Sequence, residues 1–203
     1  MKLSELIYLL KTAQTVEDID RYRDEIATLI PQIKIMFGYD QHNHAHQYDL
    51  WTHTLHTVIN LPRDVDDDMM YFAALLHDIG KPDCRCDGKR PDDTSWHYYG
   101  HPERGYEIVR DEILSYIELS DEDKRILLYY VLHHDDHISL RIKHLKRHLK
   151  EISLEEFKHL MLIEVADAKA HIMEPIIQQR VDICGQWSGE YADEMYEKIG
   201  VSL

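Results

Sequence analysis

Apolar residues recur along the chain at helical spacing, whereas the alternation typical of strands is nearly absent. One stripe begins near Asp64 and advances by 4, 3 and 4 residues through Val65, Met69, Phe72 and Leu76. A second stripe after residue 101 runs through Tyr106, Val109, Ile113 and Ile117. Because residues three and four apart share one face of an α-helix, both stripes predict amphipathic helices. The pattern as a whole predicts an all-α protein.

Polar residues at capping-box spacing mark the starts of several helices. The pairs are Thr15 with Asp18, Ser120 with Asp123, and Ser153 with Glu156. The first predicted helical segment ends before Pro31, the second contains RILLYYVLHH and is expected to be the most buried, and the third leads to Asp167. Further helices are predicted over 48–60 and from Pro175 onward.

No repeat, low-complexity tract or linker-like change in composition divides the 203 residues. A chain of this length is most simply one domain, so we expect a single helical bundle over 1–203. No window approaches about 18 consecutive apolar residues. The opening MKLSELIYLL lacks the small-residue cleavage site of a secretory signal. We interpret it as an ordinary first helix and expect no membrane partner.

Three cysteines, Cys84, Cys86 and Cys184, are too few and odd in number for a disulfide framework. They fit a reducing compartment, so we expect a cytoplasmic protein. The CRC sequence is a weak metal signal, because two thiolates without two further ligands nearby do not make a structural zinc site. We interpret it as part of a loop.

The segment KPDCRCDGKRPDDTSWHYYG, residues 81–100, is rich in turn formers and contains an Asp87-Gly88 pair. It predicts a loop or a small hairpin that covers whatever site follows Asp78. Gly80 stands where a glycine commonly ends a helix, so the helix from Asp64 is expected to finish there.

The formal net charge of −15 argues against a long nucleic acid as a partner, since binding one requires clustered lysine and arginine. The basic stretch RIKHLKRHLK, residues 141–150, is interpreted as a solvated helix face. An acidic protein can still bind a small phosphorylated molecule when a metal ion supplies positive charge.

The stretch AALLHDIGKPDC ends an apolar helix with His77 and Asp78, which lie off its main apolar stripe. A His-Asp pair alone proves nothing, because this chain of 15 histidines contains another at His134-Asp135. The placement of the candidate ligands along the predicted helices is stronger evidence for a site than the dipeptide is. Candidate ligands fall on successive predicted helices, at His53, His77 with Asp78, His101, His134 and Asp167. Helical bundles build metal sites in this way, so convergence is expected.

The motifs YDLWTHTLHTV, FAALLHDIGKP, YYGHPERGYEIV, VLHHDDHI and EVADAKAH together resemble the HD-domain phosphohydrolases. The resemblance is closest to the HD domain attached to some bacterial tRNA nucleotidyltransferases, and it covers 41–171. The catalytic nucleotidyltransferase domain has no counterpart here, so a free-standing HD domain is expected. The helices of 1–40 and the tail of 175–203 would then be accessory.

The resemblance implies a ligand set. His53, His77, Asp78 and Asp167 match a single-metal site, while His101 and His134 match the extra histidines of members that hold two metals. Asp78 would then bridge the two ions, which suits a carboxylate with two oxygens. His133 is an alternative to His134, which we prefer because the tRNA-linked members place an aspartate directly after it.

These donors suit one or two divalent ions, of Mn, Fe, Co, Ni, Zn or Mg, better than a metal that prefers thiolates. Such an ion lowers the pKa of bound water to about 7 and offsets charge on phosphoryl oxygens. Asp78 and Lys81 are the predicted catalytic residues. Lys81, Arg104 and His46 are the predicted substrate-binding residues, and for Arg104 a solvated side chain is an equal alternative.

The remaining histidines are assigned less specific roles. His42 and His44 are interpreted as surface residues of a polar loop, and His137 as a residue that orients a ligand or substrate. Five more are interpreted as structural or surface residues: His56, His144, His148, His159 and His171.

Three functions therefore stand as hypotheses. The first is a metal-dependent phosphomonoesterase or phosphodiesterase acting on a nucleotide or another small phosphorylated compound. The second is a di-iron oxygenase, because some HD-related proteins hold two irons with the same ligand set. The third is a nucleotide-sensing domain without turnover. Such a domain usually lacks one of the metal ligands, whereas all of the expected ligands are present in this sequence.

Overall fold

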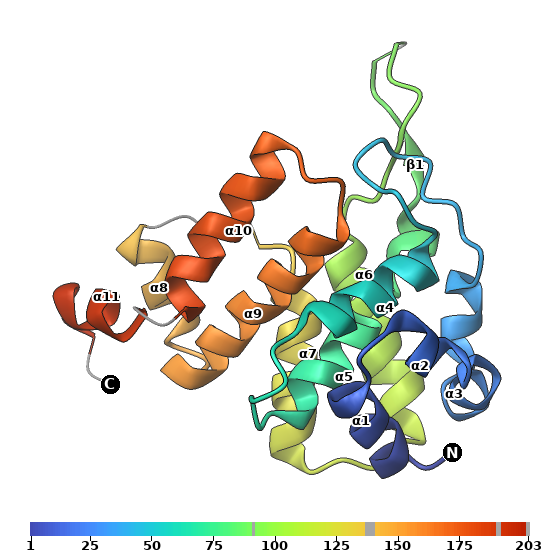
Figure 1. The fold of residues 1–203 in the computed structure, drawn as a ribbon, viewed down its shortest axis with the longest axis horizontal. Helices are drawn as coiled ribbons and strands as arrows, with labels where there is room; N and C mark the ends of the chain where they lie inside the picture. Colours follow the sequence, from blue (N-terminus) through green and yellow to red (C-terminus); the bar gives the residue numbers. More distant parts are fainter. Residues whose placement is uncertain (91, 137–140, 190–191, 202–203) are drawn as a thin grey trace.

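A computed structural model describes residues 1–90, 92–136, 141–189 and 192–201, and it is helical nearly throughout (Figure 1). The first half contains α1 (Leu3–Thr12), α2 (Val16–Asp20), α3 (Arg23–Leu29), the 3-10 helix η1 (Pro31–Met36), α4 (Leu50–Asn60), α5 (Asp68–Leu76) and the 3-10 helix η2 (Lys81–Cys84). The second half contains α6 (His101–Glu107), the π-helical turn η3 (Ile108–Glu112), the 3-10 turn η4 (Ile113–Ser115), α7 (Asp121–His133), α8 (Ile142–His148), α9 (Leu154–Ala170), α10 (Pro175–Ser188) and α11 (Ala192–Lys198). The all-α prediction is confirmed.

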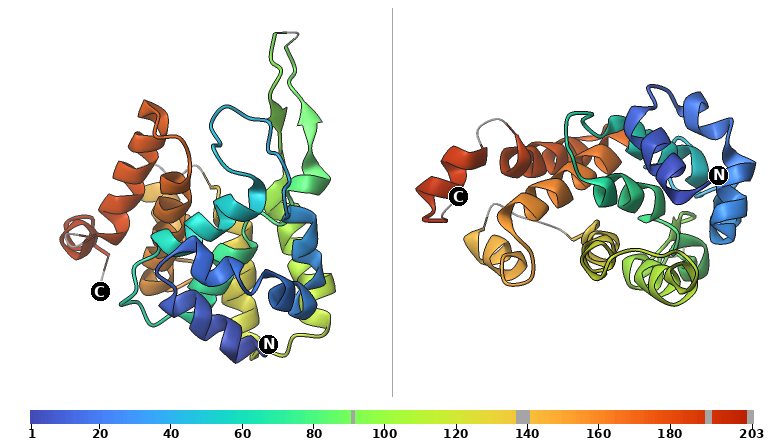
Figure 2. Two further views of the ribbon diagram at one scale, coloured as in Figure 1. Left: turned by 45° about the vertical axis from the view of Figure 1, so that its right-hand side comes forward. Right: turned by 90° about the horizontal axis from the view of Figure 1, so that it is seen from below.

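Helix α5 lies at the centre of the bundle, in contact with α1, α4, α7 and α9. Every residue from Met69 to Leu76 is buried, so no face of this helix reaches solvent. Helix α9 in turn packs on α4 and α10, and α1 and α11 lie at opposite ends of the molecule (Figure 2). The prediction that the RILLYYVLHH helix is the most buried was wrong, because α7 lies at the edge of the bundle and leaves Leu128 and Leu132 partly exposed.

The helix starts predicted from capping-box spacing are confirmed, whereas the helix predicted to begin near Asp64 begins at Asp68. Thr15 and Ser153 each form a capping box with the residue three positions on, and the Ser120 hydroxyl accepts a hydrogen bond from the Asp123 amide. The segment that Thr15 opens differs from expectation, since it holds two short helices, α2 and α3, rather than one. Its chain turns at Tyr22, whose φ of −103° and ψ of 13° lie outside the helical region.

Gly80 is not the left-handed helix cap that the sequence predicted. Helix α5 ends at Leu76, and Gly80 has a right-handed φ of −81° within the turn that follows. The glycine is needed for a different reason, because a Cβ at this position would collide with the carbonyl of His101 and the amide of Gly105. Gly80 therefore allows α6 to approach the turn that carries His77 and Asp78.

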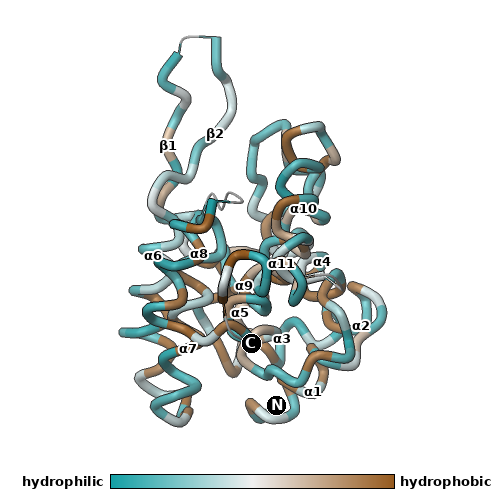
Figure 3. The backbone as a smooth tube through the Cα atoms, turned by 90° about the vertical axis from the view of Figure 1, so that its left-hand side faces the viewer, coloured by the Kyte–Doolittle hydropathy of each residue, from teal (hydrophilic) through white to brown (hydrophobic). Residues whose placement is uncertain are grey.

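The segment after η2 forms the expected hairpin. Strands β1 (Cys86–Asp87) and β2 (Trp96–His97) pair in antiparallel register, with Cys86 opposite His97. The two arms of the hairpin extend beyond the helices, and the described residues nearest its end are hydrophilic (Figure 3). None of the helices that the structure describes is both long and apolar enough to cross a membrane.

Candidate metal centre

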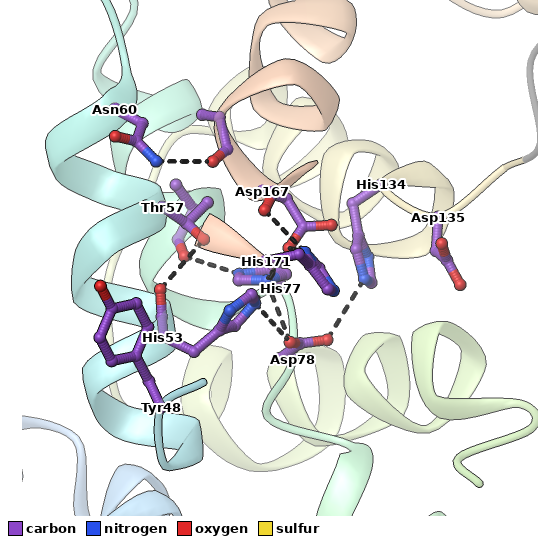
Figure 4. Close-up of polar contacts among 12 residues, drawn as sticks. Tyr48, His53, Thr57, Asn60, His77, Asp78, His134, Asp135, Asp167 and His171 are labelled. Atoms are coloured by element: carbon purple, nitrogen blue, oxygen red, sulfur yellow. Dashed lines mark hydrogen bonds and ion pairs between the residues drawn. The ribbon is translucent and has the colours of Figure 1, made fainter. Parts of the chain in front are cut away.

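Buried histidine and aspartate side chains meet between the helices of the bundle. His53 comes from the middle of α4, His77 and Asp78 from the turn after α5, and Asp167 from α9. His101 begins α6 and His134 directly follows α7. The structure therefore brings together all six residues that the sequence predicted as ligands. Figure 4 labels all of them except His101.

The first part of the centre contains two histidines and two aspartates. His53 Nε2 lies 2.9 Å from Asp167 Oδ1 and 3.4 Å from Asp78 Oδ2. His77 Nε2 lies 3.1 Å from Asp78 Oδ2 and 3.6 Å from Asp167 Oδ1. One donor atom from each residue lies within 4.8 Å of the other three, a spacing that suits a single metal ion.

The second part shares Asp78 with the first. Asp78 Oδ1 lies 3.2 Å from His101 Nε2 and 3.6 Å from His134 Nε2. The opposite oxygen, Oδ2, faces His53 and His77. One carboxylate thus presents one oxygen to each pair of imidazoles, which is the arrangement of a ligand that bridges two ions.

The contacts that the imidazole rings make away from the centre show which ring nitrogen faces the centre. Nδ1 of His77, His101 and His134 lies 2.8, 2.9 and 2.7 Å from the carbonyl oxygen of the residue three positions earlier. A carbonyl oxygen only accepts, so each Nδ1 must donate its hydrogen. In the neutral rings the lone pairs are then on Nε2 and point into the centre, as in metal-binding histidines.

Buried lone pairs of this kind are costly unless a proton or a metal ion binds them. His101 Nε2 and His134 Nε2 lie 3.2 Å apart, and neither can donate to the other when both rings are neutral. In the described ranges, His77 Nε2 and both oxygens of Asp78 are buried without a hydrogen-bond partner. Unpaired buried polar atoms are costly, and a divalent ion would satisfy these donors together. The residues present therefore fit the divalent metal that the sequence predicted.

Electrostatics keep the two carboxylates ionised. Burial alone would raise the pKa of Asp78, but His77 and Lys81 hold it well below its usual range. Asp167 behaves in the same way, with His171 and His53 opposing the effect of burial on its pKa. Burial would lower the pKa of His77, yet the Asp78 and Asp167 carboxylates raise it to about 10. The two carboxylates thus remain ionised donors for a metal ion, which would take the place of the proton that His77 otherwise holds.

Lys81 points into the centre. Its Nζ forms an ion pair with Asp78 Oδ2 at 2.7 Å, although the angles are not those of a hydrogen bond. The same Nζ donates a hydrogen bond to Gln41 Oε1 at 3.1 Å. Gln41 is buried, and its backbone carbonyl oxygen accepts a hydrogen bond from the Tyr98 hydroxyl at 2.6 Å. Gln41 therefore positions Lys81, a role that the sequence did not indicate.

His46 also lies at the centre. Its ring centroid is 5.1 Å from that of His53 and 4.4 Å from that of His171. Burial and the nearby Lys81 charge lower the pKa of His46, so its ring is neutral at pH 7. His46 was predicted to contact substrate, and its buried Nδ1 has no hydrogen-bond partner within the described part of the chain.

Arg104 is placed elsewhere. Its Nε donates to Asp83 Oδ2 at 2.7 Å and its Nη1 to Glu107 Oε2 at 3.2 Å. It lines a separate depression with Ile79 and Ile108 rather than the pocket beside Asp78. The structure does not bring this predicted substrate-binding residue to the centre, because acidic neighbours hold its guanidinium at the surface.

Besides Gln41, two residues at the centre were missed by sequence reasoning. His171, interpreted as structural or surface, donates from Nδ1 to the Asp167 carbonyl at 2.9 Å and lines the pocket. Arg180 of α10 donates to Asp167 Oδ2 at 3.1 Å, to Glu164 Oε2 at 3.1 Å and to the His134 carbonyl at 3.0 Å. No spacing signal marked Arg180, because it lies in an amphipathic stretch beyond the motifs.

The other histidines lie outside the Asp78 cluster. His133 Nδ1 pairs with Asp136 Oδ2. Of the two neighbouring residues His133 and His134, His134 is therefore the one that faces Asp78. Two more have structural contacts: His56 stacks on Tyr48 and His159 pairs with Asp67. His42 and His44 are exposed, as expected, and His137 lies outside the described residues. Cys84 and Cys86 belong to none of the metal-ligating groups found among the described residues.

A pocket of about 320 Å³ opens beside Asp78. The cationic side chains of Lys81 and Arg180 line it together with His46 and His171. Other walls are formed by the base of the hairpin and the start of α6, namely Tyr98, Tyr99 and Pro102. The pocket thus combines positive charge with apolar surface next to the cluster of metal donors.

A helical bundle with imidazole and carboxylate donors converging on one shared aspartate defines a class of metal-binding domain. The model of the HD domain family matches residues 43–177, and the chain belongs to this family. HD domains bind divalent metals and form a superfamily of metal-dependent phosphohydrolases. The match extends three residues into α10 and stops before Arg180.

Curated relatives share part of this region. The chain is 35% identical over 85 residues to a multifunctional CCA protein of Nitrosococcus oceani, which is 41% of this chain and 20% of that protein. It is 28% identical over 120 residues to a multifunctional CCA protein of Nitrosomonas eutropha, which is 58% of this chain and 27% of the relative. The chain thus spans only about a quarter of the length of these relatives or less.

Proposed function

We propose that this protein is a metal-dependent phosphohydrolase, a phosphomonoesterase or phosphodiesterase, that acts on a nucleotide or another small phosphorylated compound. One observation carries the proposal. Asp78 offers an oxygen to each of two imidazole pairs, and Lys81 Nζ stands 2.7 Å from the same carboxylate at the wall of the pocket. Metal donors and a phosphate-binding cation thus lie side by side.

The proposed roles follow from these positions. His53, His77, Asp78 and Asp167 would hold one divalent ion, and Asp78, His101 and His134 a second. A bound ion supplies a water of pKa about 7 and an electrophile for the phosphoryl oxygens. Lys81 would bind a phosphoryl oxygen as a point charge, and its three donors allow it to keep the bond to Gln41 while doing so. His46 would form a hydrogen bond with the substrate.

The pocket and the surface favour a small substrate. A volume of about 320 Å³ lies near the lower end of the usual range for ligand sites, about 300–1,000 Å³. The tyrosine rings at the base of the hairpin offer stacking surface next to the cationic wall, which suits a nucleotide. A net charge of −15 disfavours a long nucleic acid, and free Cys84, Cys86 and Cys184 suit a reducing cytoplasm.

Metal-dependent hydrolysis tests the proposal directly. Purified protein supplied with Mn, Co, Ni or Mg should release phosphate or alcohol from generic phosphomonoesters and phosphodiesters. Asp78→Asn should abolish turnover while circular dichroism shows unchanged helicity. Asp66→Asn removes an aspartate whose side chain is fully exposed, so it should leave turnover unchanged. Equal turnover in both variants would refute the proposed site.

Metal analysis separates the alternative functions. Two tightly bound irons per chain, with substrate-dependent oxygen uptake and no phosphate release, would identify an oxygenase instead. Thermal stabilisation by nucleotides without product, across all metals tried, would identify a sensing domain. The Lys81–Asp78 ion pair favours hydrolysis, because a cation at this position has a direct use in binding phosphate.

A further inference from the structure

A second group of metal-ligating side chains lies where α7 and α8 end. His133 is the last residue of α7, Asp136 follows it by three positions, and His148 is the last residue of α8. His133 Nδ1 lies 2.9 Å and His148 Nε2 3.7 Å from Asp136 Oδ2. One donor atom from each of the three lies within 4.8 Å of the others. None of these residues belongs to the Asp78 centre.

His148 has an unsatisfied donor atom aimed into this group. Its side chain is 0% exposed, and its buried Nε2 has no hydrogen-bond partner among the residues that the structure describes. The other ring nitrogen, Nδ1, lies 2.8 Å from the Tyr129 hydroxyl. When Nδ1 donates to that oxygen, the lone pair of His148 is on Nε2 and points toward Asp136. The phenol thus orients the ring as an outer partner does in metal sites.

Arg147 partly neutralises this group without completing it. Its Nη2 lies 2.8 Å from Asp136 Oδ2, but its side chain is 61% exposed and can turn into solvent. An exposed ion pair of this kind contributes little to stability. Arg147 also has no lone pair, and the unpartnered atom is His148 Nε2, a nitrogen that a metal ion would satisfy.

We propose that His133, Asp136 and His148 bind a divalent transition-metal ion of the zinc type, separate from the Asp78 centre. Two imidazoles and one carboxylate are a ligand set for zinc that leaves a fourth position open for water. The imidazoles disfavour magnesium and calcium, which prefer oxygen ligands. The ion would tie the end of α7 to α8 across the residues that follow His134. This proposal is independent of the proposed hydrolysis.

Zinc binding by the full chain tests this site without any activity measurement. The Asp78→Asn variant weakens the first centre, so that equilibrium dialysis at submicromolar free zinc reports chiefly the second. We expect about one zinc per chain in this background. Adding His148→Gln to the Asp78→Asn variant should weaken zinc binding at the second site about 100-fold. Adding His144→Gln removes an imidazole one turn earlier in α8 and outside the group, so it should leave binding unchanged.

A second variant keeps the test valid if a change at buried His148 prevents folding. The His133 side chain is 22% exposed, so His133→Gln in the Asp78→Asn background is expected to fold and to lose the same zinc. Zinc should raise the thermal midpoint of Asp78→Asn and not that of Asp78→Asn/His133→Gln. Equal zinc binding in the His133→Gln and His144→Gln double variants, or none in Asp78→Asn itself, would overturn the site.

Discussion

Lys81 and Asp78 form an ion pair in the protein interior, with Nζ 2.7 Å from Oδ2. The same oxygen faces His53 and His77, where the first ion of the proposed site would be held. A divalent cation and an ammonium group that share one carboxylate oxygen repel each other. Metal uptake is therefore expected to release Lys81 from Asp78 toward the pocket.

Replacing this lysine should separate metal binding from turnover. Lys81→Met keeps an unbranched side chain but removes the competing charge, so we expect divalent ions to bind as tightly as before or more tightly. Phosphate ester turnover should fall about 10²- to 10³-fold, the usual cost of losing one group that stabilises transition-state charge. Calorimetric metal titration and kcat measured on the same variant check both parts.

Lys34→Met is the matched control, because Lys34 is an exposed residue of η1. It should change neither metal affinity nor kcat. If Lys81→Met instead loses metal in parallel with turnover, Lys81 acts by holding the centre together and has no direct role toward substrate.

The close approach of α6 to Gly80 has a cost that can be measured. Gly80→Ala would push its new methyl group into the carbonyl of His101, so we expect a loss of about 1–3 kcal/mol in the free energy of unfolding. Displacement of His101 should also weaken binding of the second ion. Urea unfolding and metal stoichiometry measure the two effects.

The same substitution at Gly185 should have the opposite sign. Gly185 lies inside α10, and a methyl group added there would meet no other atom within 4 Å, so alanine should stabilise the protein by about 0.5–1 kcal/mol. A stabilised Gly80→Ala variant would show that α6 can move away without cost.

The six converging donors were accessible from the sequence because each lies at a position that local rules define. His77 and Asp78 follow an apolar helix, His101 begins a helix before Pro102, and Asp167 lies on a capped helix. Helix periodicity and caps depend on neighbouring residues only, and the resemblance to the HD family supplied the pairing between helices.

Other features depend on contacts that no local rule contains. Arg180 reaches Asp167 only because α10 folds back on α9, and its own segment shows nothing more than amphipathic character. Gly80 was interpreted as a helix cap because the approach of α6 is not visible in the sequence. The greater burial of α5 over α7 has the same origin, since burial depends on how many helices surround an element.

Arg180 joins the Asp167 and Glu164 carboxylates in the interior. Arg180→Met removes the guanidinium bonds to both side chains, so we expect a loss of about 3–5 kcal/mol in stability. Metal affinity should fall about 10- to 100-fold, as for other groups that orient a metal ligand. Arg180→Lys should restore little, because one ammonium cannot replace three directed guanidinium bonds. Chemical denaturation and metal titration provide the measurements.

Glu164 provides the control for this prediction. Burial raises the pKa of Glu164 to about 8 despite the Arg180 charge beside it. Glu164→Gln removes that buried acid, so the double variant Arg180→Met/Glu164→Gln should regain part of the stability that Arg180→Met loses. If the stability change of the double variant equals the sum of the changes in the two single variants, the two residues are not coupled.

Asp67 joins three helices at the end of the bundle away from the metal centre. Its Oδ1 accepts from the amides of Met69 and Met70 at 2.9 and 3.0 Å, which caps α5. Its Oδ2 accepts from the Tyr130 hydroxyl of α7 at 2.8 Å and lies 2.7 Å from His159 Nδ1 of α9. Asp67→Asn replaces the charged acceptor, so we expect about 2 kcal/mol lower stability at pH 7 by urea unfolding.

This loss should depend on pH in one direction. Burial alone would raise the pKa of Asp67, but its bonds with His159 and Tyr130 lower it below the ordinary value of 3.8. A carboxylate whose pKa is lower in the folded state stabilises the protein above its unfolded pKa and loses that effect as pH falls toward the folded value. The difference between wild type and Asp67→Asn should therefore be constant from pH 7 to about 5 and shrink below about pH 4. A pH-independent difference for Asp67→Asn would mean that geometry rather than charge makes this junction strong.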